Sequence, residues 1–180
     1  MRRVAMIAGL AALAATGVWA MQLSASPPAR IELEVDVAAP IGKVWQAWTT
    51  RDGLRSFFGE DNRVELRIGG PFEIYMSLQA PEGKRGSEGC TVLSYLPEEM
   101  LSFSWNSPPK FDHARGRHTW VVLQLTAVGR EQTRVRLVHL GFDEQRAANP
   151  EHVAEWNEVE QYFRRAWPMV LNELKSAVGS

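Results

Sequence analysis

The residues of this chain best suited to acid–base or metal chemistry are its four histidines, His113, His118, His139 and His152. A zinc site needs histidine, cysteine or carboxylate ligands at short spacings. His113 and His118 are separated by a flexible Ala-Arg-Gly-Arg stretch and have Asp112 beside them, a spacing that fits no zinc pattern. We therefore predict no metal site, and no other motif calls for a cofactor.

His139 lies in a segment that alternates in polarity. One side of this segment carries Thr133, Val135, Leu137 and His139, and the other carries Arg134 and Arg136. His139 is therefore expected to point inward with the apolar residues. It could act there as an acid–base group or as a hydrogen-bond partner for a ligand. The interpretation we favour is a core histidine whose ring is satisfied by a backbone carbonyl group.

Aromatic side chains are plentiful, with seven Trp, seven Phe and three Tyr. Rings combined with a few polar tips are typical of small-molecule pockets. The residues that we predict to line a cavity are Tyr75, Phe103, Trp105, Trp120, His139, Trp156, Phe163 and Trp167. Plain core packing is the competing interpretation for these residues.

The sequence contains no recognisable catalytic set. It has no Ser–His–Asp elbow and no glycine-rich phosphate loop, and Gly69-Gly70 is expected to form only a hairpin turn. Cys90 is the single cysteine, so no disulfide can form within the chain. Because Cys90 lies in a strand-like segment, we predict a buried, unreactive thiol and not a nucleophile.

Alternating apolar and polar residues predict a series of β-strands. Ile31 to Val37 alternates strictly, which indicates a strand with one solvent-facing side. Further strands are predicted over 64–68, 72–78, 90–96, 101–105, 118–127 and 133–140. Because mostly short turns separate neighbouring strands, they should pair in order as an antiparallel meander.

Two short helices are predicted after the first strand. Pro40 suits the first position of a helix that carries an apolar face. We expect Asp52-Gly53 to end this helix and 54–58 to form a second helical turn.

A long amphipathic helix is predicted at the end of the chain. Asn149 and Pro150 suit its N-cap and first position. Apolar residues then recur at steps of three and four as far as Val178, and Pro168 should kink or divide the helix near Arg164. Such a helix is best buried across the concave face of a curved antiparallel sheet, which gives an α+β fold.

The first residues have the layout of a secretory signal peptide. Arg2 and Arg3 precede an apolar run, and small residues end it at Ala20, with Ala25 as a second candidate cleavage site. We predict a signal peptide over 1–20, a linker over 21–30, a single domain over 31–178, and a periplasmic location. An uncleaved membrane anchor is the alternative for the N-terminal segment.

The charge balance argues against nucleic acid as a partner. The chain has 20 basic and 21 acidic residues, and removal of Arg2 and Arg3 with the signal would leave 18 basic residues. Nucleic-acid-binding domains normally carry a basic excess.

Four segments resemble the SRPBCC superfamily: APIGKVWQAWTT (39–50), VELRIGGPFEIYM (64–76), MLSFSW (100–105) and TRVRLVHLGF (133–142). Within it, the chain is most similar to homologues of the activator of the heat-shock-protein-90 ATPase. The resemblance spans about 31–178. It implies the helix-grip fold of the birch-pollen-allergen and START lipid-transfer domains, with a cavity between the sheet and the long helix. Members include lipid carriers, receptors and cyclases, so the fold alone does not decide the function.

Three functions are compatible with these observations. The one we favour is an exported protein that binds a small apolar ligand, either a lipid or an aromatic compound. The second is a cyclase- or hydratase-like enzyme that uses His139. The third is a protein-interaction module of the co-chaperone kind. The sequence does not indicate an oligomeric state.

Overall fold

A computed structural model describes residues 29–179. The expected signal peptide and nearly all of the expected linker therefore lie outside the described residues. Among the described helices, none is long and apolar enough to span a membrane.

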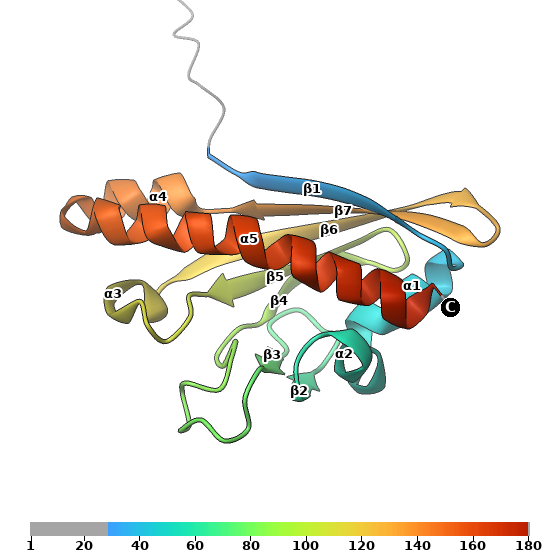
Figure 1. Cartoon of the computed structure of the whole chain (residues 1–180), viewed down its shortest axis with the longest axis horizontal. Helices are drawn as coiled ribbons and strands as arrows, with labels where there is room; N and C mark the ends of the chain where they lie inside the picture. Colours follow the sequence, from blue (N-terminus) through green and yellow to red (C-terminus); the bar gives the residue numbers. More distant parts are fainter. Residues whose placement is uncertain (1–28, 180) are drawn as a thin grey trace, which may run out of the picture.

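The main layer is a five-stranded antiparallel sheet in the order β1-β7-β6-β5-β4 (Figure 1). Its strands are β1 (Ile31–Val37), β4 (Val92–Leu96), β5 (Met100–Asn106), β6 (His118–Gly129) and β7 (Gln132–Leu140). The last four follow one another as the expected meander. The first strand instead closes the far edge against the last one.

Ion pairs on the outer face accompany the pairing of β1 with β7. Arg134 Nε lies 2.8 Å from Asp36 Oδ1, and Arg136 pairs with Glu32. Most apolar residues of the two strands point to the other face of the sheet, whereas Val138 and Leu140 lie on the outer face at the end of β7. Alternation in the sequence thus fixed both the inward and the outward faces of these strands.

The region that follows α2 differs from the expected pair of long strands. Two short strands, β2 (Asp61–Val64) and β3 (Phe72–Tyr75), form a separate ribbon, and the expected strand over 64–68 is absent. The chain turns sharply after Val64, and Gly70 N donates to Arg67 O at 2.8 Å. Gly70 is needed for this turn because a Cβ atom there would lie 2.4 Å from the carbonyl oxygen of Glu65.

The two expected short helices are present as α1 (Ile41–Thr49) and α2 (Arg51–Phe57), but their boundary lies at Thr50. Thr50 is extended, and its hydroxyl accepts a hydrogen bond from Gly53 N at 3.0 Å, which caps α2. Gly53 is therefore a residue of α2. It allows close packing, since a Cβ atom would lie 2.3 Å from Gln46 O.

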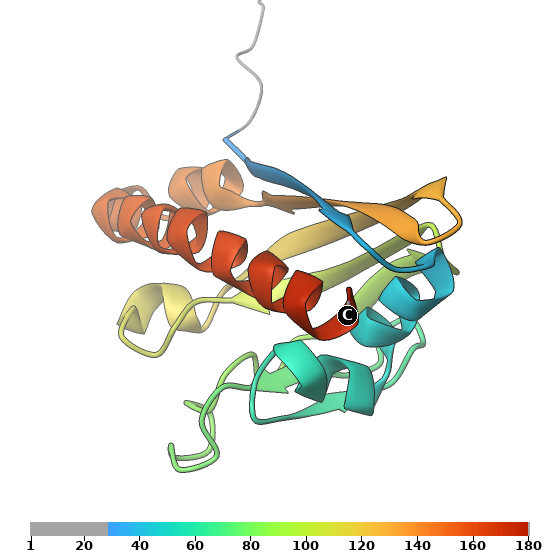
Figure 2. The same cartoon turned by 45° about the vertical axis from the view of Figure 1, so that its right-hand side comes forward.

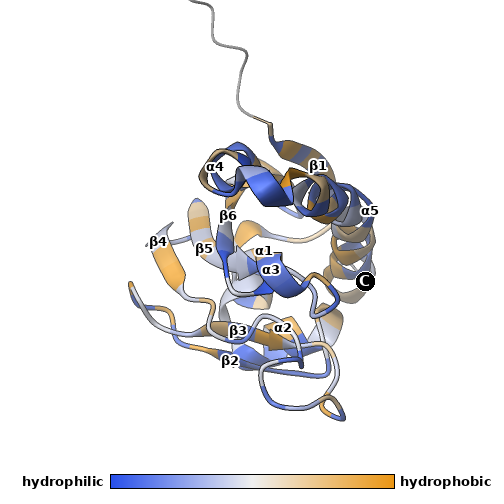
Figure 3. Cartoon of the chain, turned by 90° about the vertical axis from the view of Figure 1, so that its left-hand side faces the viewer, coloured by the Kyte–Doolittle hydropathy of each residue, from blue (hydrophilic) through white to orange (hydrophobic). Residues whose placement is uncertain are grey.

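Two further short helices were not expected from the sequence. They are α3 (Asp112–Arg115), within the long loop after β5, and α4 (Phe142–Ala148), which follows β7. Seen from one end of the molecule, both are largely hydrophilic (Figure 3). Both segments are short and contain few apolar residues, so they show no helical repeat of apolar positions in the sequence.

The long helix α5 (Val153–Val178) follows a single 3₁₀ turn at Pro150–His152. It lies along one face of the sheet, with its start near α3 and α4 and its end near α1 and α2 (Figures 1 and 2). The expected division near Arg164 does not occur. Pro168 is exposed on the outer side, so the helix continues past the missing hydrogen bond.

The core lies between α5 and the concave face of the sheet. The buried stripe of the helix contributes Trp156, Val159, Phe163, Trp167, Leu171, Leu174 and Val178. At about 1.5–3 kcal/mol for each large apolar side chain buried, this stripe is a major source of stability. The structure therefore has the α+β, helix-grip-like architecture expected from the sequence.

Candidate functional site

A pocket of about 670 Å³ lies beside α5. Its walls come from α5, the end of α2, the segment that follows β5, and the loop 76–87. Buried aromatic residues form the floor: Phe58, Trp105, Phe163 and Trp167. The exposed lining residues, which form the rim, are Met76, Lys84, Arg165, Met169 and Glu173.

The aromatic floor is held by contacts between its own rings. Phe58 stacks on Trp105 with centroids 5.6 Å apart, and Trp105 lies 5.4 Å from Trp167. Phe163 stacks on Trp167 at 6.1 Å. Because these contacts join α2, β5 and α5, the apolar surface is formed by the fold itself and does not depend on a ligand.

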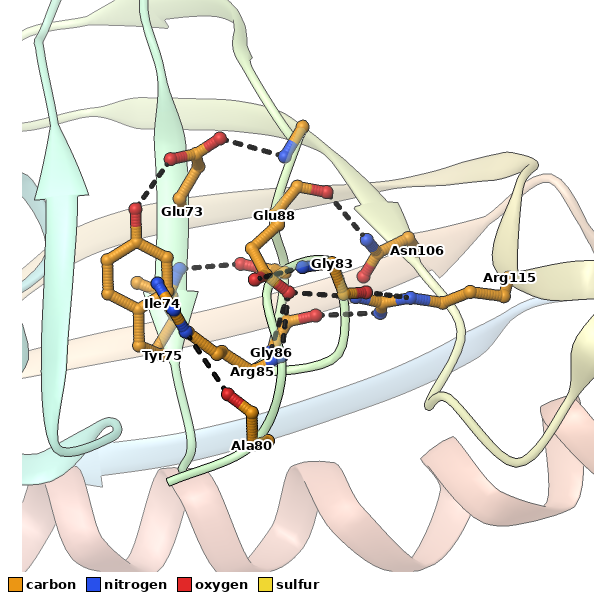
Figure 4. Close-up of polar contacts among 12 residues, drawn as sticks. Glu73, Ile74, Tyr75, Ala80, Gly83, Arg85, Gly86, Glu88, Asn106 and Arg115 are labelled. Atoms are coloured by element: carbon orange, nitrogen blue, oxygen red, sulfur yellow. Dashed lines mark hydrogen bonds and ion pairs between the residues drawn. The ribbon is translucent and has the colours of Figure 1, made fainter. Parts of the chain in front are cut away.

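The loop on the open side of the pocket is fastened by the Arg115–Glu88 ion pair, drawn in Figure 4. Arg115 Nη1 donates to Gly86 O and to Ser107 O, both at 2.7 Å, and Nη2 lies 3.1 Å from Glu88 Oε2. Glu88 Oε1 accepts from Gly83 N at 2.8 Å. The two charged side chains thus hold the loop against the end of β5.

This ion pair is largely shielded from solvent, with side-chain exposures of 16% for Arg115 and 15% for Glu88. Burial lowers the pKa of the Arg115 guanidinium, and the charge of Glu88 opposes that shift. The hydrogen bonds of Arg115 are already taken by the protein. Although it lines the pocket, it has a structural role there.

His139 lies behind the floor of the pocket and is 0% exposed. Its Nδ1 accepts a hydrogen bond from Trp167 Nε1 at 2.9 Å, so Nε2 carries the proton and donates to Thr119 Oγ1 at 2.7 Å. Thr119 in turn donates to the carbonyl oxygen of Trp105 at 3.0 Å. Burial lowers the pKa of His139 to about 3, so the ring is neutral. The network orients the Trp167 ring and ties His139 to the backbone of Trp105.

The residues predicted to line a cavity are distributed over three places. Trp105, Phe163 and Trp167 lie in the pocket wall. Phe103 and His139 lie one layer deeper; Phe103 stacks on Phe72 with centroids 4.1 Å apart. For these two, the expectation of direct lining is corrected, because other rings stand between them and the pocket.

The remaining three predicted residues do not line the pocket. Trp120 is half-buried on the outer face of β6, where it covers Gly141. Trp156 is fully buried near the start of α5. Tyr75 donates to Glu73 Oε2 at 2.8 Å, and burial is the main cause that raises its pKa to about 12. Their positions depend on which face of its strand or helix each side chain occupies, and composition alone does not reveal this.

Several lining residues were missed in the sequence. Phe57 and Phe58 end α2, and the adjacent Phe-Phe pair at a helix terminus is the signal that would have found them. The basic residues Lys84, Arg85 and Arg165 come from a polar loop and from a solvated helix face. They are far apart in sequence, so no local pattern joins them.

Cys90 is fully buried, and burial is the main cause that raises its thiol pKa to about 12. At neutral pH the thiol is protonated and shielded. This agrees with the unreactive cysteine expected from the sequence.

The fold and the sequence pattern agree with one protein family. The model of the activator of Hsp90 ATPase homolog 1-like proteins matches residues 38–179. The chain belongs to this family. A search of curated protein sequences gave no significant match.

Solved structures show the same fold. Protein MLL2253 from Mesorhizobium loti is 21% identical, with a TM-score of 0.58 over 83% of this chain and 96% of that chain. The Aha1 dimer from Colwellia psychrerythraea is 21% identical, with a TM-score of 0.53 over 84% and 96%. CalU16 from Micromonospora echinospora is 22% identical, with a TM-score of 0.53 over 83% and 65%. At these identities the likeness concerns the fold.

Proposed function

We propose that this family member binds one small apolar ligand that carries an acidic group. The observation that carries the proposal is the pocket of about 670 Å³ with an aromatic floor and a basic rim. Its volume falls in the range of small-molecule sites, which span about 300–1,000 Å³. The rings of the floor offer apolar contact area to a chain or a fused-ring skeleton.

The charges on the rim select for an acidic group. Besides Arg115, which is occupied by the loop, three cations line the pocket together with the carboxylate of Glu173: Lys84, Arg85 and Arg165. Within residues 29–179, no hydrogen bond or ion pair occupies the side chain of Lys84 or Arg165. A ligand carboxylate or phosphate at the rim would pair with these cations while its apolar part contacts the floor.

The proposal gives no catalytic role to His139. Both ring nitrogens are already hydrogen-bonded, and the ring is separated from the pocket by Trp105 and Trp167. Arg115 is likewise occupied by the loop. The groups left free at the pocket are suited to holding a ligand by charge and apolar contact.

Export of the protein is the second part of the proposal, and it rests on the sequence. Arg2 and Arg3 followed by an apolar run have the layout of a secretory signal. Cell fractionation with sequencing of the mature N-terminus tests it. A mature chain that begins after Ala20 or Ala25 in the periplasmic fraction is expected, whereas an uncut chain confined to the cytosol would contradict export.

Ligand binding is tested by intrinsic tryptophan fluorescence, since two floor residues are tryptophans. Oleate should change the emission in a saturable way, and oleyl alcohol should bind more weakly because it lacks the charge. In the Lys84→Ala/Arg165→Ala double variant, the Kd for oleate should rise about tenfold, equivalent to about 1.4 kcal/mol, while the Kd for oleyl alcohol stays unchanged.

Lys43→Ala is the matched control, because Lys43 is exposed on α1 and lies outside the pocket. It should leave both affinities unchanged. If the alcohol binds as tightly as oleate, or if Lys43→Ala weakens oleate as much as the double variant does, the basic rim has no role in selection. If neither probe nor an aromatic carboxylate binds, the ligand-binding proposal fails.

A further inference from the structure

A cluster of metal-ligating side chains lies at the end of the molecule where α3 meets the start of α5. One ligand atom each from His113, Glu151 and His152 lie within 4.8 Å of one another. His113 comes from α3, and the other two come from the 3₁₀ turn that precedes α5. None of the three lines the pocket described above.

The two histidine rings are unusually close. They stack with centroids 3.3 Å apart and an interplanar angle of 15°. His113 Nε2 is buried and has no hydrogen-bond partner among the described residues. A buried ring nitrogen without a partner loses its hydration without compensation, which destabilises the folded state. A coordinate bond to a metal ion would supply the missing interaction.

Glu155 holds the two elements of this cluster together. Its Oε1 accepts from the backbone N–H groups of His113 and Ala114, at 3.1 and 3.0 Å. Its Oε2 lies 3.8 Å from His152 Nδ1, and Glu151 Oε1 lies 3.7 Å from His152 Nε2. The cluster is therefore supported by a residue beyond the three candidate ligands, as functional metal sites usually are.

We propose that His113, His152 and Glu151 bind a divalent transition-metal ion of the zinc class, which joins α3 to the start of α5. Two imidazoles and a carboxylate suit zinc and its neighbours in preference to calcium or magnesium, which favour oxygen ligands. Tetrahedral zinc places its ligand atoms about 3.4 Å apart. The three ligand atoms lie within 4.8 Å of one another, so binding requires the stacked rings to rotate and the ligand atoms to draw closer.

The sequence pattern concealed this cluster. His118 is the nearest histidine to His113 in the sequence, whereas its spatial partner is His152. The side chain of His118 is exposed at the start of β6 and lies outside the cluster. This makes His118 a matched control for the other two histidines.

Isothermal titration of the untagged full chain with Zn²⁺ tests the site. We expect saturable binding of one ion per chain. His113→Ala and His152→Ala should each weaken binding by at least about tenfold, and Glu151→Gln should weaken it less. His118→Ala should leave the affinity unchanged. Absence of saturable Zn²⁺ binding, or equal losses in His118→Ala and His113→Ala, would overturn the proposal.

A second measurement on the unmodified protein is independent of how the variants fold. With histidine rings labelled with ¹⁵N, Zn²⁺ should shift the imidazole signals of two of the four histidines, and those of His118 and buried His139 should stay in place. Shifts confined to His118, or no shift at all, would contradict the site.

Because Arg115 also belongs to α3, Zn²⁺ should in addition slow amide exchange in the 83–88 loop.

Discussion

At the level of single residues, His139 shows how an apparent catalytic group can be structural. Its alternation with apolar residues correctly predicted that it points inward, and the core interpretation is confirmed by its complete burial. The partner differs from the expectation, because Trp167 and Thr119 take the place of a backbone carbonyl group. The sequence could not reveal this, since these partners are 28 and 20 residues away along the chain.

The buried neutral ring should make stability depend on pH. In the folded state the pKa of His139 is lowered to about 3, against 6.5 for a free histidine. Between these values the unfolded chain binds a proton that the folded chain does not, so stability falls as the pH falls below about 6.5. At pH 5 the free energy of unfolding should be about 2 kcal/mol lower than at neutral pH from this residue alone.

Urea unfolding of the wild type and of His139→Gln across this pH range isolates the effect. The wild type should lose about 2 kcal/mol more than the variant between neutral pH and pH 5. Equal losses in both proteins would show that the ring is not buried as a neutral group. NMR titration of the His139 ring in the wild type gives the same test without a substitution, because no protonation should be seen near pH 5.

At the level of elements, strand and helix patterns were recognised better than their boundaries. Each strand of the main sheet overlaps a strand predicted from the sequence, because one face packs on the core and polarity therefore alternates along the strand. The alternation over 64–68 predicts a strand, whereas β2 ends at Val64 because the chain turns between Glu65 and Gly70. The Arg115–Glu88 pair was not predicted, since it joins a loop and a short helix that are both polar.

The Arg115–Glu88 pair should be important for the pocket loop. Arg115→Ala removes the side-chain donor to the carbonyl groups of Gly83, Gly86 and Ser107. It also removes the charge paired with Glu88, whose carboxylate keeps its backbone N–H donors. We expect a loss of at least about 2 kcal/mol in the free energy of unfolding and faster hydrogen exchange over 83–88. Chemical denaturation and exchange mass spectrometry measure the two effects.

The control for this change is Arg51→Ala. Arg51 also pairs with a carboxylate, Asp61, but its side chain is 62% exposed. An exposed pair contributes less than about 1 kcal/mol, so the loss should be small. If the two substitutions cost the same, shielding of the Arg115–Glu88 pair does not contribute to loop stability.

At the level of the whole molecule, the proposed function depends on a pocket that no single segment forms. The floor comes from α2, β5 and α5, and the basic rim comes from α5 and the loop 76–87. The sequence predicted the architecture and three of the floor or wall residues, Trp105, Phe163 and Trp167. It could not predict the basic rim, because Lys84 and Arg165 are 81 positions apart in the sequence and line the same pocket only in the folded chain.

Native mass spectrometry of the protein purified from the cells that make it tests ligand binding most directly. We predict an added mass at one ligand per chain, lost on denaturation, extracted into organic solvent and carrying an acidic group. The pocket-filling variant Ala166→Trp should remain folded and lack this mass, because Ala166 lines the pocket at a half-buried position. A protein mass without any addition in repeated preparations, together with no binding of oleate or an aromatic carboxylate, would contradict the account.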